Sequence, residues 1–236
     1  PLMRPGTSRP PKLVVFDLDH TLIACDATIL WTEFLYEKKI VTDPIWRQYD
    51  RDMVKSYAKG VLDIRDFCRK HSGAFRSIPE EKLHALAQEF AKKKIAPLIF
   101  PDGKKWAKNA LQANIPACVL SASAAFIVKP IAKLFGLTDA MGIELAFKDG
   151  FCTGEIVGIP TFQEGKVERL SERLAEAGIG FEDVLFFTDS RNDLPLAERA
   201  GYTVCVNPDA VLESAARKNG WKVAEWKLSP VSYTHL

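Results

Sequence analysis

Two acidic residues, Asp17 and Asp19, follow directly on an apolar run at residues 12–16 (KLVVF). Side chains alternate along a strand, so both carboxylates are expected to project to the same side of the chain. If the run is a strand of an open α/β sheet, they emerge at its carboxyl end, where such sheets bind ligands. Two neighbouring carboxylates repel each other unless a cation lies beside them or one is protonated. The motif therefore fits metal-dependent chemistry, although such residues also cap the helix after many strands.

A second stretch, residues 184–193 (VLFFTDSRND), repeats this design: an apolar run ends in Asp189, and Asp193 follows four residues later. If both runs form central parallel strands, these two acids converge with Asp17 and Asp19 on one site. Several carboxylates in one crevice need a hard divalent cation, and few oxygen ligands with open water positions suit Mg²⁺. Two independent turn-and-cap motifs at matching strand ends would be the less economical interpretation.

Two further features fit a phosphate group. The apolar run at residues 117–120 ends in Ser121, Ala122 and Ser123, small residues expected to open a helix, where a hydroxyl and free backbone N–H groups can hold an anion. Simple capping of that helix by Ser123 is the alternative. Lys166 begins a predicted helix, a position that the helix dipole disfavours for a cation. Most lysines in such positions are only solvated, so Lys166 gains weight from the other motifs.

The elements that must position these residues alternate along the chain. Apolar runs typical of strands buried on both faces lie at residues 12–16, 117–120, 184–187 and 203–206. Helical patterns that end at glycine lie at residues 124–135, 165–177 and 194–200. This alternation predicts an α/β protein with a Rossmann-like parallel sheet and helices on both faces. Residues 142–147 and 151–157 are typical of a β-hairpin around Asp149 and Gly150.

One long stretch, from about Asp26 to Ile95, shows helical periodicity and no convincing strand. Some seventy helical residues are too many for an ordinary strand-to-helix connection, which predicts an inserted helical cap domain. The expected division is a disordered lead-in at residues 1–11, a catalytic core at 12–24 and 98–228, a cap at 25–97, and a tail at 229–236. Residues 230–236 resemble translated adapter sequence from a sequencing library, so the tail is expected to be non-native.

Composition excludes several classes of protein. The 236 residues are 47% hydrophobic, and 32 basic against 30 acidic residues give a net charge of +2 without long single-sign runs. No basic footprint for nucleic acid is present, and no apolar run is long enough to span a membrane. Five scattered cysteines without zinc-site spacing are typical of a reducing compartment, so a cytoplasmic location is expected. A homodimer is left open.

The order of these motifs, DLDHT, then LSAS, then a lysine opening a helix, then TDSRND, resembles the haloacid dehalogenase superfamily of phosphotransferases. The resemblance covers nearly the whole chain. It is strongest to the subgroup with a helical cap between the first two motifs, which includes phosphoserine phosphatase and related bacterial hydrolases. Four motifs in this order are highly specific, whereas any one of them alone is weak.

The resemblance implies a Mg²⁺-dependent phosphomonoester hydrolase. Asp17 would be the nucleophile that forms an aspartyl-phosphate, and Asp19 would protonate the leaving alcohol and then activate water. Mg²⁺ would be held by the carboxylates of Asp17 and Asp189 and the backbone carbonyl of Asp19. Ser121 and Lys166 would neutralise the phosphoryl oxygens. Three further residues are expected to contact and orient these groups without binding the substrate themselves: Thr21, Asn192 and Asp193.

The resemblance also implies a small phosphorylated metabolite as substrate, similar to phosphoserine, histidinol phosphate or a phospholipid head group. Ser121 and Ala122 would line the substrate site. Asp26 lies where phosphoserine phosphatases carry a glutamate that binds the substrate amine, and Arg69 falls near their carboxylate-binding arginine. Asp26 could equally cap a helix, and Arg69 could be a solvated helical residue. The sequence departs from that pattern at Asp26 and Ala122, which puts phosphoserine itself in doubt.

Two other functions stay open. One is a phosphoryl-binding module similar to a receiver domain, which carries a phosphorylatable Asp17 and a metal but has no turnover. The other is a phosphotransferase with an acceptor other than water. A receiver needs neither a cap nor an acid for a leaving alcohol, so Asp19 and Lys166 favour the hydrolase.

Overall fold

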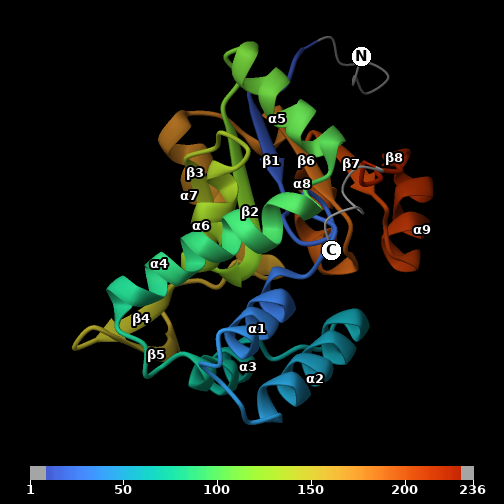
Figure 1. Cartoon of the computed structure of the whole chain (residues 1–236). Helices are drawn as coiled ribbons and strands as arrows, with labels where there is room; N and C mark the ends of the chain where they lie inside the picture. The colour runs from blue at the N-terminus through green and yellow to red at the C-terminus, as the bar shows by residue number, and fades with distance from the viewer. Residues whose placement is uncertain (1–8, 230–236) are drawn as a thin grey trace.

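A six-stranded parallel sheet forms the centre of the computed structural model, which describes residues 9–229 (Figure 1). The strands are β1 (Leu13–Phe16), β2 (Ala117–Ala124), β3 (Asp139–Ile143), β6 (Val184–Thr188), β7 (Tyr202–Val206) and β8 (Lys222–Ala224). Their order is β3-β2-β1-β6-β7-β8, so β1 is hydrogen-bonded between β2 and β6. The strands that carry the first and last acidic motifs are therefore neighbours, as the sequence predicted.

Helices cover both faces of this sheet. The α-helices of the described residues, which also include those of the stretch between β1 and α5, are α1 (Ala27–Glu37), α2 (Ile45–Lys59), α3 (Ile64–His71), α4 (Glu80–Phe90), α5 (Pro101–Gln112), α6 (Ala125–Lys133), α7 (Glu164–Ala177), α8 (Leu194–Arg199) and α9 (Ala210–Asn219). Alternate residues of β1 enter different clusters: Val14 and Phe16 pack with α5 and α6, whereas Leu13 and Val15 pack with α7 and α8. A strand that is buried on both faces reads as a continuous apolar run. The predicted Rossmann-like α/β fold is confirmed.

Two strands of the sheet, β3 and β8, were not predicted from the sequence. Both lie at edges of the sheet and are only partly buried, so neither reads as a continuous apolar run. The predicted hairpin exists, with arms β4 (Leu145–Lys148) and β5 (Phe151–Ile156). Asp149 and Gly150 between them have φ of 53° and 80°, the left-handed conformations that a two-residue turn requires. Residues 142 and 143, predicted as part of the hairpin, belong instead to β3.

The stretch between β1 and α5 is helical, as predicted, from α1 to α4 and the short π-helix η2 (Ala91–Ile95). In Figure 1, α1, α2 and α3 lie together at one end of the sheet, near the β4–β5 hairpin. Trp31, Phe34 and Phe90 from this stretch belong to the same apolar cluster as one face of the sheet: Trp31 packs against Phe90 and against Phe126 of α6, and Phe90 packs against Phe34. The exact division into core and cap stays a prediction, and residues 1–8 and 230–236 lie outside the described part.

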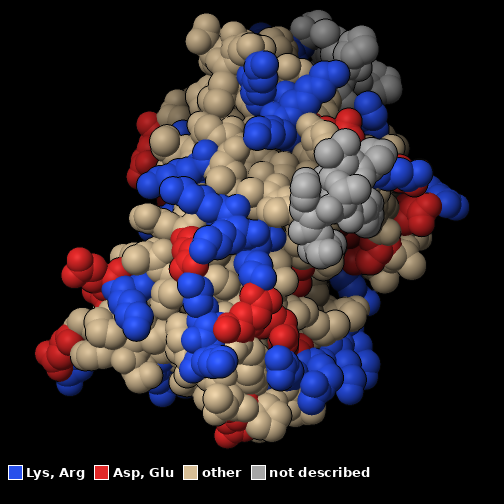
Figure 2. Space-filling view, in the orientation of Figure 1, with Lys and Arg blue, Asp and Glu red and all other residues tan. Residues whose placement is uncertain are grey.

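Charges of both signs are interspersed over the face in Figure 2. The longest basic run, Lys92 to Lys94, lies in η2, and two of its lysines pair with glutamates: Lys93 with Glu89, and Lys94 with Glu37. Within residues 9–229, no helix has the length and apolar character that crossing a bilayer requires.

A buried acid lies within the helical stretch. Asp50 of α2 is only 4% exposed, and its Oδ1 lies 3.4 Å from Nε2 of His71 on α3. The same Nε2 lies 2.9 Å from the hydroxyl of Thr32 on α1. Burial raises the pKa of Asp50 to about 7 and lowers the pKa of His71 to about 4. The three helices α1, α2 and α3 therefore meet at a group that resists ionisation.

We expect the substitution Asp50→Asn to remove a pH dependence of stability. The native protein holds the Asp50 proton more tightly than the unfolded chain, so this stabilisation is present at low pH and is lost as pH rises to about 7. Relative to D50N, the free energy of unfolding of the unmodified protein should fall by up to ~1.4 kcal/mol per pH unit between about pH 4 and 7. Urea unfolding at a series of pH values measures it.

His71 titrates in both proteins, so their difference isolates Asp50. The matched control is Asp52→Asn, an exposed aspartate on the same helix, which should keep the profile of the unmodified protein. Parallel profiles for the unmodified protein and D50N would show that the Asp50 proton does not contribute.

Candidate active site

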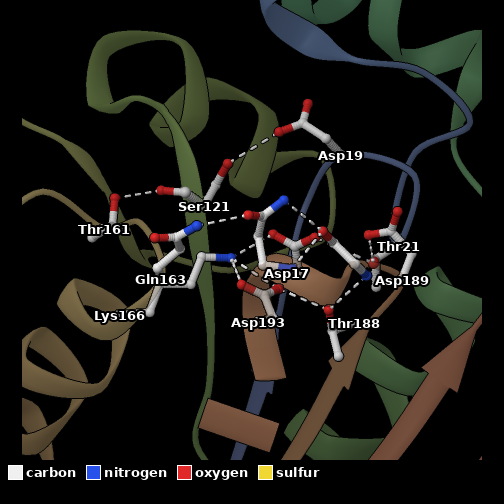
Figure 3. A network of polar contacts seen from close by, with 12 residues as sticks. Asp17, Asp19, Thr21, Ser121, Thr161, Gln163, Lys166, Thr188, Asp189 and Asp193 are labelled. Carbon is white, nitrogen blue, oxygen red and sulfur yellow. Dashed lines mark hydrogen bonds and ion pairs between the residues drawn. The ribbon is translucent and has the colours of Figure 1, made fainter. Parts of the chain in front are cut away.

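The first acidic motif lies at the carboxyl end of β1. The backbone N–H of Asp17 donates to the carbonyl of Phe187 at 2.9 Å, which continues the pairing of β1 with β6 by one residue. The chain then turns tightly, because the carbonyl of Leu18 accepts from the N–H groups of Thr21, Leu22 and Ile23. This turn places the carboxylates of Asp17 and Asp19 at the edge where β2 and β6 also end (Figure 3).

The carboxylate of Asp17 is buried, and its two oxygens have different surroundings. Its Oδ1 accepts from Nζ of Lys166 at 2.9 Å. Its Oδ2 lies 3.4 Å from the hydroxyl of Thr21, which also donates to Oδ1 of Asp189 at 3.0 Å. One side of Asp17 thus faces a cation from α7, and the other faces a second carboxylate from the end of β6.

The pair formed by Asp17 and Asp189 fits a divalent cation. Burial and the neighbouring Asp17 raise the pKa of Asp189 well above its usual range, because two carboxylates here repel each other. Oxygen ligands of this kind suit Mg²⁺. Among the described residues, no group of three or more His, Cys, Asp and Glu side chains has the arrangement of a metal site. A metal would therefore need other oxygens besides the two carboxylates, and the backbone carbonyl of Asp19 is the predicted third ligand.

Lys166 is fully buried in the first turn of α7. Its Nζ lies 2.9 Å from Asp17 Oδ1 and 2.8 Å from Asp193 Oδ1, and the hydroxyl of Thr188 donates to the other oxygen of Asp193 at 2.7 Å. Burial alone would lower the pKa of Lys166, but the carboxylates of Asp17 and Asp193 overcome this effect and raise it. Lys166 therefore stays charged beside Asp17.

Asp19 has a separate set of partners. Its carboxylate accepts from the backbone N–H of Ala27 at 2.6 Å, the hydroxyl of Ser121 at 3.2 Å and the hydroxyl of Ser123 at 2.9 Å. Burial, and then the nearby charge of Asp26, raise the pKa of Asp19 to about 6. A carboxyl group that exchanges its proton near neutral pH suits general acid–base chemistry.

The expected helix opening at Ser121 to Ser123 is wrong by a few residues. These residues belong to the end of β2, and α6 begins at Ala125 without a side-chain cap, so Ser123 does not cap it. The strand continues because β2 pairs with β3 as far as Ala124. Ser121 is buried at this strand end, and its carbonyl accepts a hydrogen bond from the hydroxyl of Thr161.

A cavity of about 240 Å³ opens above these groups. Its floor includes Asp17, Asp19, Asp189, Ala122 and Ser123. Its walls come from the helical stretch and include Ile29, Met53, Val54, Tyr57, Leu62 and Phe67. The cavity therefore joins a charged floor to largely apolar walls.

The two predicted cap contacts differ in outcome. Asp26 lines the cavity and also caps α1, because its Oδ1 accepts from the N–H of Ile29 at 3.1 Å. Arg69 is not among the residues that line the cavity, and its guanidinium lies 3.8 Å from Glu155 on the β4–β5 hairpin. The structure thus brings Asp26 to the candidate site and leaves Arg69 outside it.

The other predicted site residues converge at the carboxyl ends of β1, β2 and β6: Asp17, Asp19, Thr21, Ser121, Ala122, Lys166, Asp189, Asn192 and Asp193. Their individual roles stay predictions. Further residues contact this group and were not predicted as site residues: Tyr57, Ser123, Thr161, Gln163 and Thr188. Ser123 and Thr188 belong to the serine and last acidic motifs, so the sequence carried a signal for them, whereas nothing local singles out Tyr57 or Gln163.

Comparisons with known proteins agree with this geometry. A family model described as haloacid dehalogenase-like hydrolase matches residues 14–198. A histidinol-phosphatase of Neisseria meningitidis serogroup C is 35% identical over 220 residues, which cover 92% of this chain and 99% of the relative. A phosphoserine phosphatase of Mycobacterium tuberculosis is 26% identical and covers 97% of this chain and 77% of the relative.

Solved structures show the same fold. A protein of unknown function from Bordetella pertussis Tohama I superposes with a TM-score of 0.82 and 30% identity, covering 91% of this chain and 98% of its own. A phospho-aspartyl intermediate analogue of phosphoserine phosphatase gives a TM-score of 0.67 at 22% identity, covering 94% and 96%.

Proposed function

The chain belongs to the haloacid dehalogenase-like hydrolase family and is a phosphatase, and we propose that it hydrolyses small phosphomonoesters through a phosphoryl group carried on Asp17, with Mg²⁺ as cofactor. One observation carries the proposal: the buried Asp17 lies between a charged Lys166 on one oxygen and the Thr21–Asp189 pair on the other. This arrangement holds the nucleophile in one orientation, with a cation on one side to compensate a phosphate and a second carboxylate on the other to share a divalent cation with it.

The proposed reaction has two steps. In the first, a carboxylate oxygen of Asp17 forms a bond to phosphorus, the bond between phosphorus and the leaving oxygen breaks, and Asp19 gives that oxygen its proton. In the second, Asp19 takes a proton from water, whose oxygen attacks phosphorus and releases Asp17 and inorganic phosphate. The raised pKa of Asp19 supports both proton transfers. Its hydrogen bonds to Ser121 and Ser123 keep its carboxyl group facing the cavity.

Charge compensation divides between the two sides of Asp17. Bound by Asp17, Asp189 and the backbone carbonyl of Asp19, Mg²⁺ would offset the repulsion between an anionic nucleophile and a dianionic substrate. On the other side, Lys166 would neutralise a phosphoryl oxygen, with Asp193 holding its ammonium group in place. The hydroxyl of Ser121 would turn from Asp19 to donate to a second phosphoryl oxygen when substrate binds, while Ser123 keeps its hydrogen bond to Asp19.

The cavity favours some of the candidate substrates over others. Asp26 contributes a carboxylate to the lining, and no Lys or Arg is among the described residues that line this cavity. A leaving group with an ammonium would be attracted to Asp26, whereas a carboxylate would meet three aspartates besides Asp26 and no described lysine or arginine, with His20 and hydroxyl groups as its available partners. Among the substrates suggested by the relatives, an amine-bearing compound without a carboxylate, such as histidinol phosphate, therefore fits better than phosphoserine. The walls leave room for an aromatic or apolar portion.

The proposal is tested by phosphate release from histidinol phosphate, phosphoethanolamine, phosphoserine and p-nitrophenyl phosphate, with Mg²⁺ and after chelation. We expect turnover with Mg²⁺, loss with chelator, and higher kcat/KM for phosphoethanolamine than for phosphoserine, which differ only by the carboxylate. No release from any compound would defeat the hydrolase. A phosphoryl group persisting on Asp17 would favour the receiver-like module, and transfer to an added alcohol would favour a phosphotransferase.

Asp19→Asn separates the two proton transfers. We expect turnover of alkyl phosphates to fall by roughly 10²- to 10⁴-fold, because an alkoxide needs a proton to leave. The first step with p-nitrophenyl phosphate should survive, since nitrophenolate leaves without one, and should appear as a burst of nitrophenol in stopped-flow measurements. Asp43→Asn, an exposed aspartate before α2, is the matched control. Alkyl phosphate turnover by D19N at the unmodified rate would contradict the role.

A further inference from the structure

Gln163, the residue before α7, has an unusual backbone conformation. Its φ and ψ are 49° and −124°, a region that glycine adopts readily and that strains other residues. Strain of this kind persists only where the surroundings impose it, and it gathers at functional sites. The side chain of Gln163 is therefore the feature to explain.

The amide of Gln163 joins the helical stretch to the sheet. Its Nε2 donates to the carbonyl of Gly60, at the end of α2, at 3.2 Å, and to Oδ1 of Asn192 at 2.9 Å. Nδ2 of Asn192 in turn donates to the carbonyl of Tyr57, in the last turn of α2, at 2.8 Å. We call this chain of contacts from Gln163 and Asn192 to the two carbonyls the amide relay.

The amide relay connects α2 to both loops that supply charged groups to Asp17. Gln163 lies three residues before Lys166, and Asn192 lies between Asp189 and Asp193. Any displacement of the end of α2 must therefore strain or break contacts with both loops. The loop before Lys166 and the loop that contains Asp189 are therefore both hydrogen-bonded to the C-terminal end of α2.

The end of α2 also carries a wall of the cavity. The ring of Tyr57 packs against Phe162 with centroids 6.0 Å apart, and it lines the cavity above Asp17 and Asp189. Burial raises the pKa of Tyr57, and the charges of Asp193, Asp17 and Asp189 add to this effect. A wall so close to the carboxylates excludes water when α2 is seated and admits it when α2 moves away.

We propose that Gln163 is a positioning residue whose amide seats the end of α2 over Asp17 and aligns the Lys166 and Asp189 loops at the same time. This inference rests on the proposed function for its effect on catalysis, but the coupling of α2 to the two loops is a property of the fold. The strained backbone at Gln163 is then retained because this conformation directs the amide to both Gly60 and Asn192.

Gln163→Gly separates this role from a structural one. Glycine takes the same backbone angles without strain, and this relief offsets the loss of the two hydrogen bonds from the Gln163 amide, so the thermal midpoint should stay the same or rise. The amide relay is lost, and misplacement of the charged groups should lower kcat/KM for phosphoethanolamine by about tenfold to a hundredfold. A residue kept only for structure would not give unchanged or higher stability together with lower activity.

The matched control is Asn114→Gly. Asn114 is another non-glycine residue with positive φ, 57°, and it is exposed between α5 and β2, at the opposite end of the strands from Asp17. This variant should show the same or higher thermal midpoint and unchanged kcat/KM. Hydrogen exchange measured by mass spectrometry gives a readout without substrate: amides of α2 should exchange faster in Q163G than in N114G, while those of β1 and β6 should not.

The outcomes separate the two proposals. If the unmodified protein is inert with every phosphomonoester, the proposed function fails, and hydrogen exchange alone decides whether the amide relay seats α2. If the unmodified protein is active, Q163G with unchanged kcat/KM overturns the positioning role. Unchanged exchange in α2, or a loss of activity accompanied by a lower thermal midpoint, also overturns it.

Discussion

Asp17→Asn is expected to abolish phosphate release, with a loss on the order of 10⁴-fold or more in kcat. An amide keeps the size of the side chain and can still accept a hydrogen bond from Lys166, but it cannot form the acyl phosphate. The substitution also removes one of the two carboxylates expected to hold Mg²⁺. Phosphate release from p-nitrophenyl phosphate with Mg²⁺ measures the loss, and mass spectrometry after acid quench shows whether a phosphoryl group is still attached.

The loss of activity in D17N can be attributed to the missing nucleophile only if the variant still folds. Thermal unfolding of D17N should remain cooperative, because the shape of the buried group is retained. Asp102→Asn, an exposed aspartate in the first turn of α5, removes the same charge away from the site and should keep full activity. Residual turnover by D17N close to that of D102N would mean that Asp17 is not the nucleophile.

Lys166→Met is expected to damage both activity and stability. The ammonium group compensates two buried carboxylates, Asp17 and Asp193, at 2.9 and 2.8 Å. Removing one partner of a buried ion pair leaves charges without compensation and costs about 3–5 kcal/mol. Phosphate release should be lost as well, since the cation beside the phosphoryl oxygens is gone. Urea unfolding and phosphate release measure the two effects.

A second substitution separates the two effects of Lys166→Met. In the double variant K166M/D193N one of the two uncompensated charges is removed, so part of the lost stability should return while activity stays lost. Lys218→Met, an exposed lysine in the last turn of α9, controls for loss of a positive charge and should change neither quantity. If K166M were as stable as K218M, the ion pairs would not contribute to the native fold.

Much of the site followed from local pattern. Asp17 and Asp189 each end a continuous apolar run, and such runs become neighbouring central strands because both of their faces need to be buried. The carboxyl ends of neighbouring parallel strands lie side by side, so Asp17 and Asp189 come close together. Lys166 was not predictable from its place at the start of a helix alone, and it gained weight only from the order of the four motifs.

The sequence predicted that residues 26–95 are helical, but it did not predict which residues these helices contact. Its residues have helical periodicity, which describes the faces of each helix, but the angle at which α2 approaches the sheet depends on packing with distant residues. Arg69 illustrates the limit: its place in the sequence suggested a substrate contact, whereas α3 directs it toward Glu155. The extension of β2 through Ser123 depended likewise on the partner strand β3.

The amino-acid sequence by itself determined the α/β fold, the edge of the sheet at which chemistry takes place and the acids gathered there, since strand periodicity and burial are local properties. Only the tertiary structure decided which groups surround Asp19, that Asp26 and not Arg69 lines the cavity, and that Gln163 joins α2 to two loops. These contacts connect segments as far apart as 135 positions, between Tyr57 and Asn192, and no local pattern encodes how such segments pack.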